Sequence, residues 1–402
     1  MAASLKARRY IDADFAYGAR NYAPLPVVIE RGKGAYVWDV DGKRYTDMLS
    51  AYSALNQGHC HPAIAAAARA QLGKLTLTSR AFHNTLMGRF LKAITAATGQ
   101  DKAIPMNSGA EAVETAIKAM RLWGYRRKSI AANRAEIIVA RNNFHGRTTT
   151  IVGFSTDPDA YEGFGPATPG FVEVDYGSIE ALENAIGDRT CGILLEPIQG
   201  EAGVRIPPDG YLRGVRALCT RENVLFCADE IQTGLGRTGA LLAVDHEGVR
   251  PDLVVLGKAL SGGFYPISAV AGSEKVLGLF APGTHGSTFG GNPLASAIGL
   301  AALDVIKREK LPARAAKLGA RFLKRLRSLD DPRLLEARGR GLMVALEFKQ
   351  PVAKAFCKAL MARGVLAKDT HATTVRFAPP LVITEAQLDA AFVAIRDTLI
   401  SF

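Results

Sequence analysis

The stretch Asp252-Leu-Val-Val-Leu-Gly-Lys258 is a short apolar run that ends on a lysine. A second such run, Val224-Leu-Phe-Cys-Ala-Asp229, ends on an aspartate. Short apolar runs of this kind are typical of strands buried on both faces in a parallel sheet. Because ligands bind at the carboxyl ends of such strands, we expect Lys258 and Asp229 to bring an amine and a carboxylate to one sheet edge. A buried structural ion pair is the alternative for these two residues alone.

The rest of the middle of the chain alternates short apolar runs with helical patterns, which predicts an α/β domain with a mostly parallel sheet. The predicted strands are residues 136–140, 192–196, 224–229 and 253–256, and the predicted helices are residues 110–124, 179–186, 210–222 and 292–307. Short strands joined by glycine turns are expected over residues 27–49, and helices surrounding strands at 341–348 and 373–377 are expected beyond residue 310.

These patterns divide the chain into three expected parts. Residues 1–55 form an N-terminal segment that packs with the small domain, residues 56–305 form the large domain, and residues 306–402 form a smaller C-terminal α+β domain. A length of 402 residues is consistent with two or three domains.

Composition excludes several classes of protein. The chain is 48% hydrophobic and 22% charged, and it has no apolar run of about 18 residues, so disorder, collagen and a membrane span are excluded. The start, MAASLKARRYIDADF, has no apolar signal-peptide core, and the five scattered cysteines have no C-x-x-C spacing. We therefore expect a soluble, cytoplasmic protein with reduced cysteines and no membrane partner.

The net charge of +12 raises the question of a nucleic-acid partner. The densest basic stretch, residues 307–327, carries apolar residues at helical spacing: Leu311, Ala315, Leu318, Phe322 and Leu326. This pattern predicts an amphipathic helix with a basic solvent face, and no aromatic residues interleave the charges as stacking platforms would. The positive charge therefore favours anionic substrates and an anionic cofactor over nucleic acid.

Three other motifs suggest sites that their context does not support. Gly234-Leu-Gly-Arg-Thr-Gly239 matches a dinucleotide fingerprint, but the strand ends five residues earlier and no clear helix opens at Gly239. Gly257-Lys258 lacks the remaining residues of a nucleotide-binding P-loop. His59-Cys-His61 could suggest zinc, but adjacent residues cannot easily converge on one ion, so we favour a turn before a helix at Pro62 and expect no metal site.

The segment Asn107-Ser-Gly-Ala-Glu111 opens a strong helical pattern. Its small residues leave backbone N–H groups free to close on an anion at the positive helix end. An ordinary N-cap at Ser108 with a capping box to Glu111 explains the same residues. Combined with a strand-end lysine and aspartate, however, the anion cup fits pyridoxal 5'-phosphate, which needs a lysine for its Schiff base, a carboxylate at its ring nitrogen and a phosphate cup.

Longer motifs carry a resemblance over nearly the whole chain. They include Leu75-Thr-Leu-Thr-Ser-Arg-Ala81, Asn143-Phe-His-Gly-Arg147, Glu196-Pro-Ile-Gln-Gly-Glu-Ala-Gly203, Ala228-Asp-Glu-Ile-Gln-Thr-Gly234, His285-Gly-Ser-Thr-Phe-Gly-Gly-Asn292 and Arg376-Phe-Ala-Pro-Pro380. With them, the chain resembles the ornithine aminotransferases, in class III of the fold-type I pyridoxal-phosphate enzymes. The resemblance implies a large domain with a mostly parallel central sheet, a smaller α+β domain, and a homodimer or a dimer-based oligomer.

The resemblance also implies roles for individual residues. Around the cofactor these are Lys258 as Schiff-base residue and proton shuttle, Asp229 at the pyridine nitrogen, Gln232 near the phenolic oxygen, Phe144 on the ring, and Ser108, Gly109 and Ala110 at the phosphate, with Thr288 from the neighbouring subunit. Around the substrate they are Tyr22, Tyr52, Arg147, Glu201 and Arg376. His145 and Ala110 depart from the family pattern, since animal members often carry Trp and Val there.

The implied reaction moves the δ-amine of L-ornithine to 2-oxoglutarate, giving glutamate 5-semialdehyde and glutamate, as in proline biosynthesis and arginine catabolism. Arg147 can hold the α-carboxylate far from the reacting amine, while Glu201 neutralises Arg376. A solvated surface carboxylate is the alternative for Glu201. Alternative functions are transamination of N-acetylornithine or 4-aminobutyrate, a pyridoxal-phosphate aminomutase or racemase, and a non-catalytic protein that keeps the fold; intact Lys258 and Asp229 argue against the last.

Overall fold

A seven-stranded sheet forms the centre of the molecule, which is described from a computed structural model over residues 4–402. The strand order is β4-β10-β9-β8-β7-β5-β6, with β4 (Lys102–Met106), β5 (Glu136–Ala140), β6 (Phe171–Val174), β7 (Thr190–Leu195), β8 (Leu225–Asp229), β9 (Leu253–Leu256) and β10 (Ser268–Gly272). All neighbours from β9 to β6 pair in parallel, whereas β10 is antiparallel to both β4 and β9. The predicted fold class is therefore confirmed.

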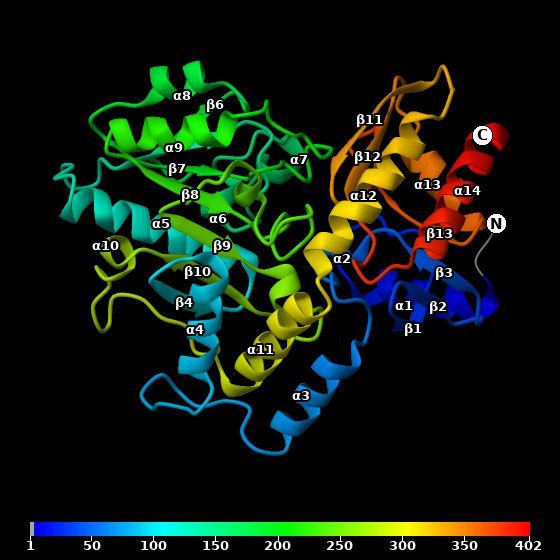
Figure 1. Ribbon diagram of the computed structural model, residues 1–402, viewed down its shortest axis with the longest axis horizontal. Helices are drawn as coiled ribbons and strands as arrows, with labels where there is room; N and C mark the ends of the chain where they lie inside the picture. Colours follow the sequence, from blue (N-terminus) through cyan, green and yellow to red (C-terminus); the bar gives the residue numbers. More distant parts are fainter. Residues whose placement is uncertain (1–3) are drawn as a thin grey trace.

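Helices cover both faces of this sheet because its strands are apolar on both sides. Along β9, Leu253 and Val255 pack into one core with α5 (Gly109–Arg126), while Val254 and Leu256 pack into the other core with α9 (Tyr211–Arg221). Side chains alternate between the two faces of a strand, so α5 and α9 lie on opposite sides of the sheet. Figure 1 shows the resulting layered part, which also includes α8 (Ile179–Ala185) and α11 (Pro293–Arg308).

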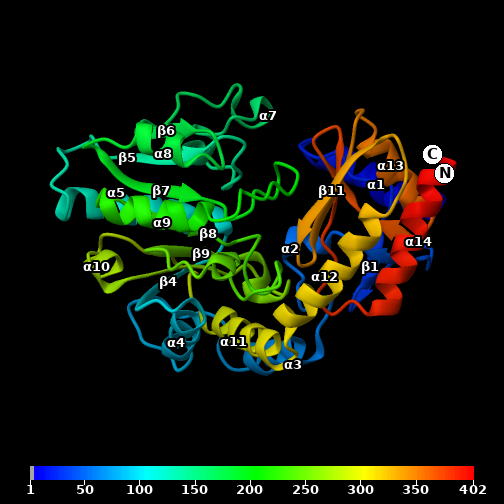
Figure 2. The ribbon, with the colours of Figure 1, turned by 45° about the horizontal axis from the view of Figure 1, so that its top comes forward.

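A second part lies beside the layered one, on the right in Figures 1 and 2. Its antiparallel sheet has the order β11-β12-β15-β14, made of β11 (Leu334–Arg340), β12 (Met343–Phe348), β14 (Lys368–Thr370) and β15 (Thr374–Phe377). The helices α12 (Leu311–Arg327), α13 (Ala353–Ala362) and α14 (Glu385–Ser401) pack around it. On α12 the five apolar residues of the predicted stripe are buried, which confirms the amphipathic helix, although it begins four residues later than the basic stretch does.

The N-terminal strands join this second part. The sheet β1-β2-β3-β13 combines β1 (Ile29–Lys33), β2 (Tyr36–Asp39) and β3 (Arg44–Asp47) with β13 (Val365–Leu366) from the C-terminal quarter. The remaining elements are α1 (Leu5–Tyr17), α2 (Ser50–Ser53), α3 (Pro62–Leu72), α4 (Met87–Thr98), α6 (Thr149–Val152), α7 (Pro158–Tyr161), η1 (Ala243–Glu247), η2 (Lys258–Ser261) and α10 (Glu274–Leu277). The three-part division at residues 55 and 305 stays a prediction.

The predicted elements of the middle region are all present, with ends shifted by at most two residues. Among the elements not anticipated from the sequence are the strands β4, β6, β10, β11, β13 and β14 and the helices α1 and α4. Pro62 opens α3 as expected, and the two histidines before it contact different acidic partners, His59 with Asp47 at 2.7 Å and His61 with Glu309 at 2.9 Å. Within residues 4–402, no helix combines the length and the apolar character needed to cross a bilayer.

Candidate active site

A cavity of about 210 Å³ lies at the carboxyl ends of the central strands. Asp229 is the last residue of β8, and Lys258 follows β9 after a single glycine. The lining consists of residues from these strand ends and the facing loops: Gly109, Ala110, Phe144, His145, Gly146, Glu196, Ile198, Glu201, Asp229, Ile231, Gln232, Thr233 and Lys258. The predicted meeting of an amine and a carboxylate at one sheet edge is therefore present.

Lys258 borders this cavity in surroundings that disfavour its charge. Burial lowers the pKa of the ammonium group; the Glu201 carboxylate opposes this effect and the Arg376 guanidinium adds to it, so that the pKa lies below its ordinary value. A lysine with a lowered pKa has a larger neutral fraction, and the neutral amine is the form that attacks a carbonyl carbon.

Asp229 is oriented by two hydrogen bonds. Its Oδ2 lies 2.7 Å from His145 Nδ1, and its Oδ1 accepts a bond of 3.0 Å from the Ile231 backbone N–H. Asp229 and His145 are both buried, and the other ring nitrogen of His145, Nε2, has no hydrogen-bond partner among the described residues. Burial lowers the pKa of His145, but its hydrogen bond to Asp229 and the charges of Asp229 and Glu196 outweigh that effect and raise it.

Glu196 adds a second buried carboxyl group to this corner. Its Oε2 accepts a bond of 3.0 Å from the Phe144 backbone N–H, so it also fixes the loop that carries His145. Burial raises the pKa of Glu196 to about 7, against the attraction of the charged His145. Two further buried titratable groups, His145 and Glu196, therefore lie close to Asp229.

The start of α5 forms the opposite wall of the cavity. Ser108 caps the helix, and its capping box with Glu111 is present, so the ordinary N-cap expected from the sequence is confirmed. Gly109 and Ala110 nevertheless line the cavity with the first turn of the helix. A Cβ atom on Gly146 would lie 2.9 Å from Ala110 Cβ, so only glycine lets the Phe144 loop approach the helix this closely.

Pyridoxal phosphate fits this set of groups. One cavity combines an amine of lowered pKa, a buried carboxylate held by a histidine, and the positive end of an 18-residue helix. These are the groups that a Schiff base, a protonated ring nitrogen and a phosphate require. Lys258, Asp229 and the first turn of α5 would hold the cofactor.

Glu201, which lines this cavity, forms an ion pair with the buried Arg376. Glu201 Oε1 lies 2.7 Å from Arg376 Nη1, and Gln232 Nε2 donates to the same oxygen at 2.9 Å. Burial raises the pKa of Glu201, but the charge of Arg376 and its hydrogen bond outweigh this and lower it to about 2. Glu201 is thus not a solvated surface carboxylate.

A larger cavity of about 1090 Å³ adjoins the first, and both are lined by Phe144, His145, Gly146 and Glu201. Three more of the predicted substrate residues, Tyr22, Tyr52 and Arg147, line only the larger one. Arg376 lies 5.2 Å from the centre of the Tyr52 ring. The structure therefore brings the five predicted substrate residues together.

Two predicted cofactor residues lie apart from this group. Ser108 is exposed and its hydroxyl accepts a hydrogen bond within its own helix. Thr288 is also exposed, in the loop before α11, and neither residue lines the two cavities. Their contacts with the cofactor stay predictions.

Tyr52 belongs to a turn with an unusual backbone. Ser50, Ala51, Tyr52 and Ser53 all have positive φ angles, between 47° and 73°. A left-handed turn costs roughly 1–2 kcal/mol per residue for side chains with a Cβ atom. Hydrogen bonds hold it in place: Asp47 Oδ1 accepts from the Ser50 backbone N–H at 2.8 Å, and the buried Arg237 donates to the Ser50 hydroxyl at 3.1 Å.

Sequence reasoning did not identify Glu196 as a site residue, and it treated His145 only as a departure from a family pattern. Glu196 directly follows the buried strand β7, which is the same signal that identified Asp229. His145 stands between Phe144 and Arg147, two residues already predicted to face the site. Both signals were in the sequence.

Known proteins are similar to this chain in sequence and in fold. The profile of the aminotransferase class-III family matches residues 17–399. The ornithine aminotransferase of Bordetella pertussis is 56% identical over 376 residues, 93% of this chain and 91% of that protein. The crystal structure of the ornithine aminotransferase of Toxoplasma gondii matches with a TM-score of 0.96 at 46% identity, over 98% of this chain and 95% of that one. The acetylornithine aminotransferase of Elizabethkingia anophelis matches with a TM-score of 0.90 at 47% identity, over 98% and 99%.

Proposed function

The chain belongs to the class-III aminotransferase family, and on this premise we propose that it transfers the δ-amino group of L-ornithine to 2-oxoglutarate. The products are glutamate 5-semialdehyde and glutamate, which connects the reaction with proline biosynthesis and arginine catabolism. Relatives named ornithine aminotransferase, 52–56% identical over nearly the full chain, support this choice of donor. The cofactor is pyridoxal 5'-phosphate, which when bound supplies a sink for the electrons released at the reacting carbon.

The observation that carries the proposal is the ion pair of Glu201 and Arg376 beside the cavity of Lys258. An α-amino acid reacts at the carbon that bears its carboxylate, so it needs a cation close to Lys258. L-Ornithine reacting at its δ-amine must keep that carboxylate away. When Glu201 neutralises Arg376, the site suits the δ-amine of ornithine. When the Glu201 side chain moves aside, Arg376 is free to bind the carboxylate of an α-amino acid.

The other residues take the roles that their positions suit. Arg147, exposed in the larger cavity, would bind the α-carboxylate of ornithine with its planar guanidinium. Lys258 Nζ would carry a proton between the amine-bearing carbon of the substrate and the reacting carbon of the cofactor. Asp229 would hold a proton at the ring nitrogen of the cofactor. Gln232 would lie near the phenolic oxygen, Phe144 would stack on the ring, and Gly109 and Ala110 would bind the phosphate.

We further propose a cytoplasmic homodimer in which Thr288 and Ser108 complete the phosphate sites. Thr288 lies exposed in a glycine-rich loop and so is available to a second copy of the chain. Sedimentation of the active enzyme at working concentration tests the assembly. A fully active monomer would contradict it.

A donor comparison tests the function. Purified enzyme with 2-oxoglutarate is given ornithine, N-acetylornithine or 4-aminobutyrate, and the rate of glutamate formation is measured. We expect ornithine to give the highest kcat/KM. N-Acetylornithine is the second candidate, because the acetylornithine aminotransferase of E. anophelis is as similar in sequence as the ornithine enzyme of T. gondii. A preference for that donor, or turnover without an oxo-acid acceptor, would overturn the proposal.

A further inference from the structure

The loop that carries Glu201 is a small hairpin, residues 199–205, which we refer to as the Glu201 hairpin. Its two ends are joined by backbone hydrogen bonds, from Gln199 N–H to Arg205 O at 3.1 Å and from Arg205 N–H to Gln199 O at 2.9 Å. Gly203 and Val204 have positive φ angles of 94° and 55°, which turn the chain back on itself. Glu201 thus sits on a narrow hairpin that projects from the central sheet toward the second part of the molecule.

The second sheet receives this hairpin on one face. Across its strands, Arg338 of β11 pairs with Ala345 of β12, and Ala345 pairs with Arg376 of β15. Residues directly opposite each other in a sheet have side chains on the same face. Two arginines with a small residue between them therefore face the hairpin, and Ala345 belongs to the same buried apolar cluster as Val204 of the hairpin.

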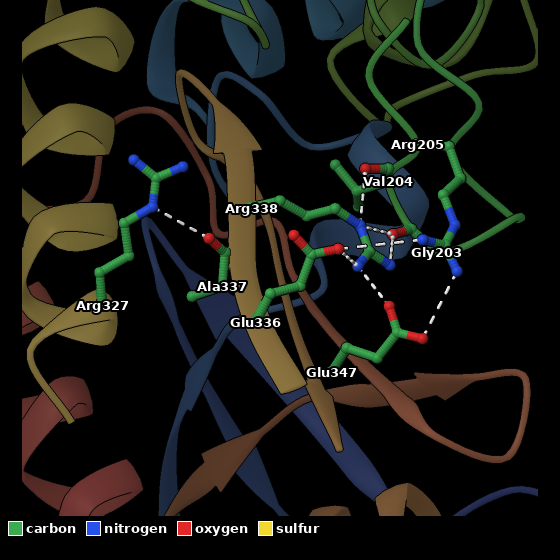
Figure 3. Close-up of polar contacts among 8 residues, drawn as sticks. All are labelled: Gly203, Val204, Arg205, Arg327, Glu336, Ala337, Arg338 and Glu347. Atoms are coloured by element: carbon green, nitrogen blue, oxygen red, sulfur yellow. Dashed lines mark hydrogen bonds and ion pairs between the residues drawn. The ribbon is translucent and has the colours of Figure 1, made fainter. Parts of the chain in front are cut away.

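The two arginines hold different parts of the hairpin. Arg376 binds the side chain of Glu201, whereas Arg338 binds the backbone behind it. Arg338 Nε donates to Gly203 O at 2.9 Å and to Val204 O at 3.2 Å, and its Nη2 donates to Gly203 O at 2.6 Å. Figure 3 shows this fork around the two carbonyl groups.

Arg338 is itself fixed from the other side. Its Nη1 forms ion pairs with Glu336 and Glu347, and Arg205 of the hairpin reaches Glu347 at 3.4 Å (Figure 3). Only 7% of Arg338 is exposed. A buried guanidinium that loses an ionic partner raises the free energy of the folded protein. The two carboxylates therefore hold Arg338 in this position.

We propose that Arg338 is a positioning residue that acts through Glu201 and thereby sets which amine the enzyme uses. The inference rests on the proposed function. Glu201 has to pair with Arg376 for one substrate and release it for the other. With the hairpin backbone held at Gly203 and Val204, that exchange needs only a side-chain rotation. With a loose hairpin, the carboxylate is misplaced and Arg376 is free more of the time to capture the α-carboxylate of ornithine.

The test compares single-turnover rates of ornithine and glutamate for Arg338→Gln and Arg338→Lys. Glutamine cannot form the fork, and lysine keeps the charge beside Glu347 but cannot reach both carbonyl groups at once. We expect the ratio of ornithine to glutamate rates to fall about tenfold in Arg338→Gln and less in Arg338→Lys. If Arg338→Gln does not fold, Arg338→Lys still tests the proposal, because a fall in the same rate ratio is expected for it.

Arg327→Gln is the matched control. Arg327 comes from α12 and donates to the carbonyl of Ala337 at 3.0 Å, next to Arg338 on the same strand but away from the hairpin (Figure 3). We expect this variant to keep the wild-type ratio. An equal fall in the control would show that general loosening of β11 is the cause and would overturn the proposal.

A double-mutant cycle with Glu201→Ala separates positioning from general structure. If Arg338 acts through Glu201, Arg338→Gln changes the ratio less than twofold once Glu201 is absent. Hydrogen exchange gives a readout independent of turnover: the Gln199 and Arg205 amides should exchange about tenfold faster in Arg338→Gln, with β9 unchanged. A ratio change that persists without Glu201, or unchanged hairpin exchange, contradicts the proposal. Failure of the wild type to use ornithine would instead refute the proposed function.

Discussion

Glu201 meets Arg376 with both of its oxygens, Oε1 at 2.7 Å from Nη1 and Oε2 at 3.3 Å from Nη2. Arg376 is only 1% exposed, and its Nε has no hydrogen-bond partner among the described residues. The pair therefore satisfies most of a buried guanidinium, and removal of either partner leaves a charge without its counterpart. Arg376 can therefore exchange Glu201 for a substrate only if that substrate brings a carboxylate of its own. The pair thus allows Arg376 to alternate between Glu201 and the α-carboxylate of a substrate.

Replacing Glu201 with alanine leaves Arg376 free beside the cavity. We expect glutamate to react as well as or better than with the wild type and ornithine to react more slowly, with a change in their rate ratio of about 10²-fold. That factor corresponds to about 2.7 kcal/mol, within reach of a charge-assisted pair. Arg376→Ala should have the opposite effect, impairing glutamate and largely sparing ornithine. Single-turnover rates measure both, and equal slowing of both substrates by Glu201→Ala would show that Glu201 is only structural.

Lys258→Ala should abolish the visible absorption band that the cofactor has when it is bonded to a lysine. Transamination should fall at least 10³-fold, because the variant also loses the proton-carrying amine. Lys128→Ala is the control: burial lowers the pKa of Lys128 too, but its amine donates to the carbonyl groups of Thr190 and Glu222, at the amino ends of β7 and β8 and thus at the other end of these strands from the cavity. A visible band that survives in Lys258→Ala, or disappears in Lys128→Ala, would refute the assignment.

His145→Phe should make the stability of the cofactor-free protein less dependent on pH. The pKa of His145 is raised in the folded chain, because its bond to Asp229 and the nearby charges outweigh burial. Its contribution is therefore fully present below the ordinary pKa of about 6.5 and is lost as the pH rises through the folded value. Unfolding free energies of both proteins from pH 6 to pH 10 measure this. The unfolding free energy of the wild type should exceed that of His145→Phe by less and less as the pH rises. A difference that stays constant or grows would contradict the expectation.

Ala51→Gly should stabilise the protein by about 1 kcal/mol. Ala51 is exposed and has a φ angle of 47°, which glycine adopts without the cost of a Cβ atom. Ala66→Gly in α3, also at an exposed position, should destabilise by about the same amount because glycine is unfavourable within a helix. Denaturant unfolding of the two variants gives the sign of each change. Equal destabilisation by both would show that the turn at Ala51 is not strained.

The centre of the fold and of the site could be predicted because local patterns specify them. An apolar run that ends on a polar residue, in a chain that predicts a parallel sheet, indicated Asp229 and Lys258 as candidate site residues. The same pattern holds for Glu196 after β7. The strand β10 was missed because it is short and its antiparallel pairing depends on which strands, β4 and β9, come to lie beside it.

Contacts between distant segments could not be predicted in the same way. Arg338 and the carbonyl of Gly203 are 135 residues apart, and neither residue type indicates the other. The register that puts Arg338, Ala345 and Arg376 in one row follows from strand pairing, not from any spacing in the sequence. The contact of Thr288 with a second subunit depends on assembly and stays a prediction.

The row across the second sheet bears on how donor preference can change during evolution. Ala345 lines neither cavity, yet it is fully buried in one apolar cluster with Val204 of the Glu201 hairpin, between the two arginines. A larger residue there would lift the hairpin and shift the Glu201 carboxylate without altering any group that touches the donor. Selection for a different amine donor could therefore act on Ala345, which lies buried beneath the Glu201 hairpin. A comparison of enzymes that is restricted to cavity residues would not detect such a difference.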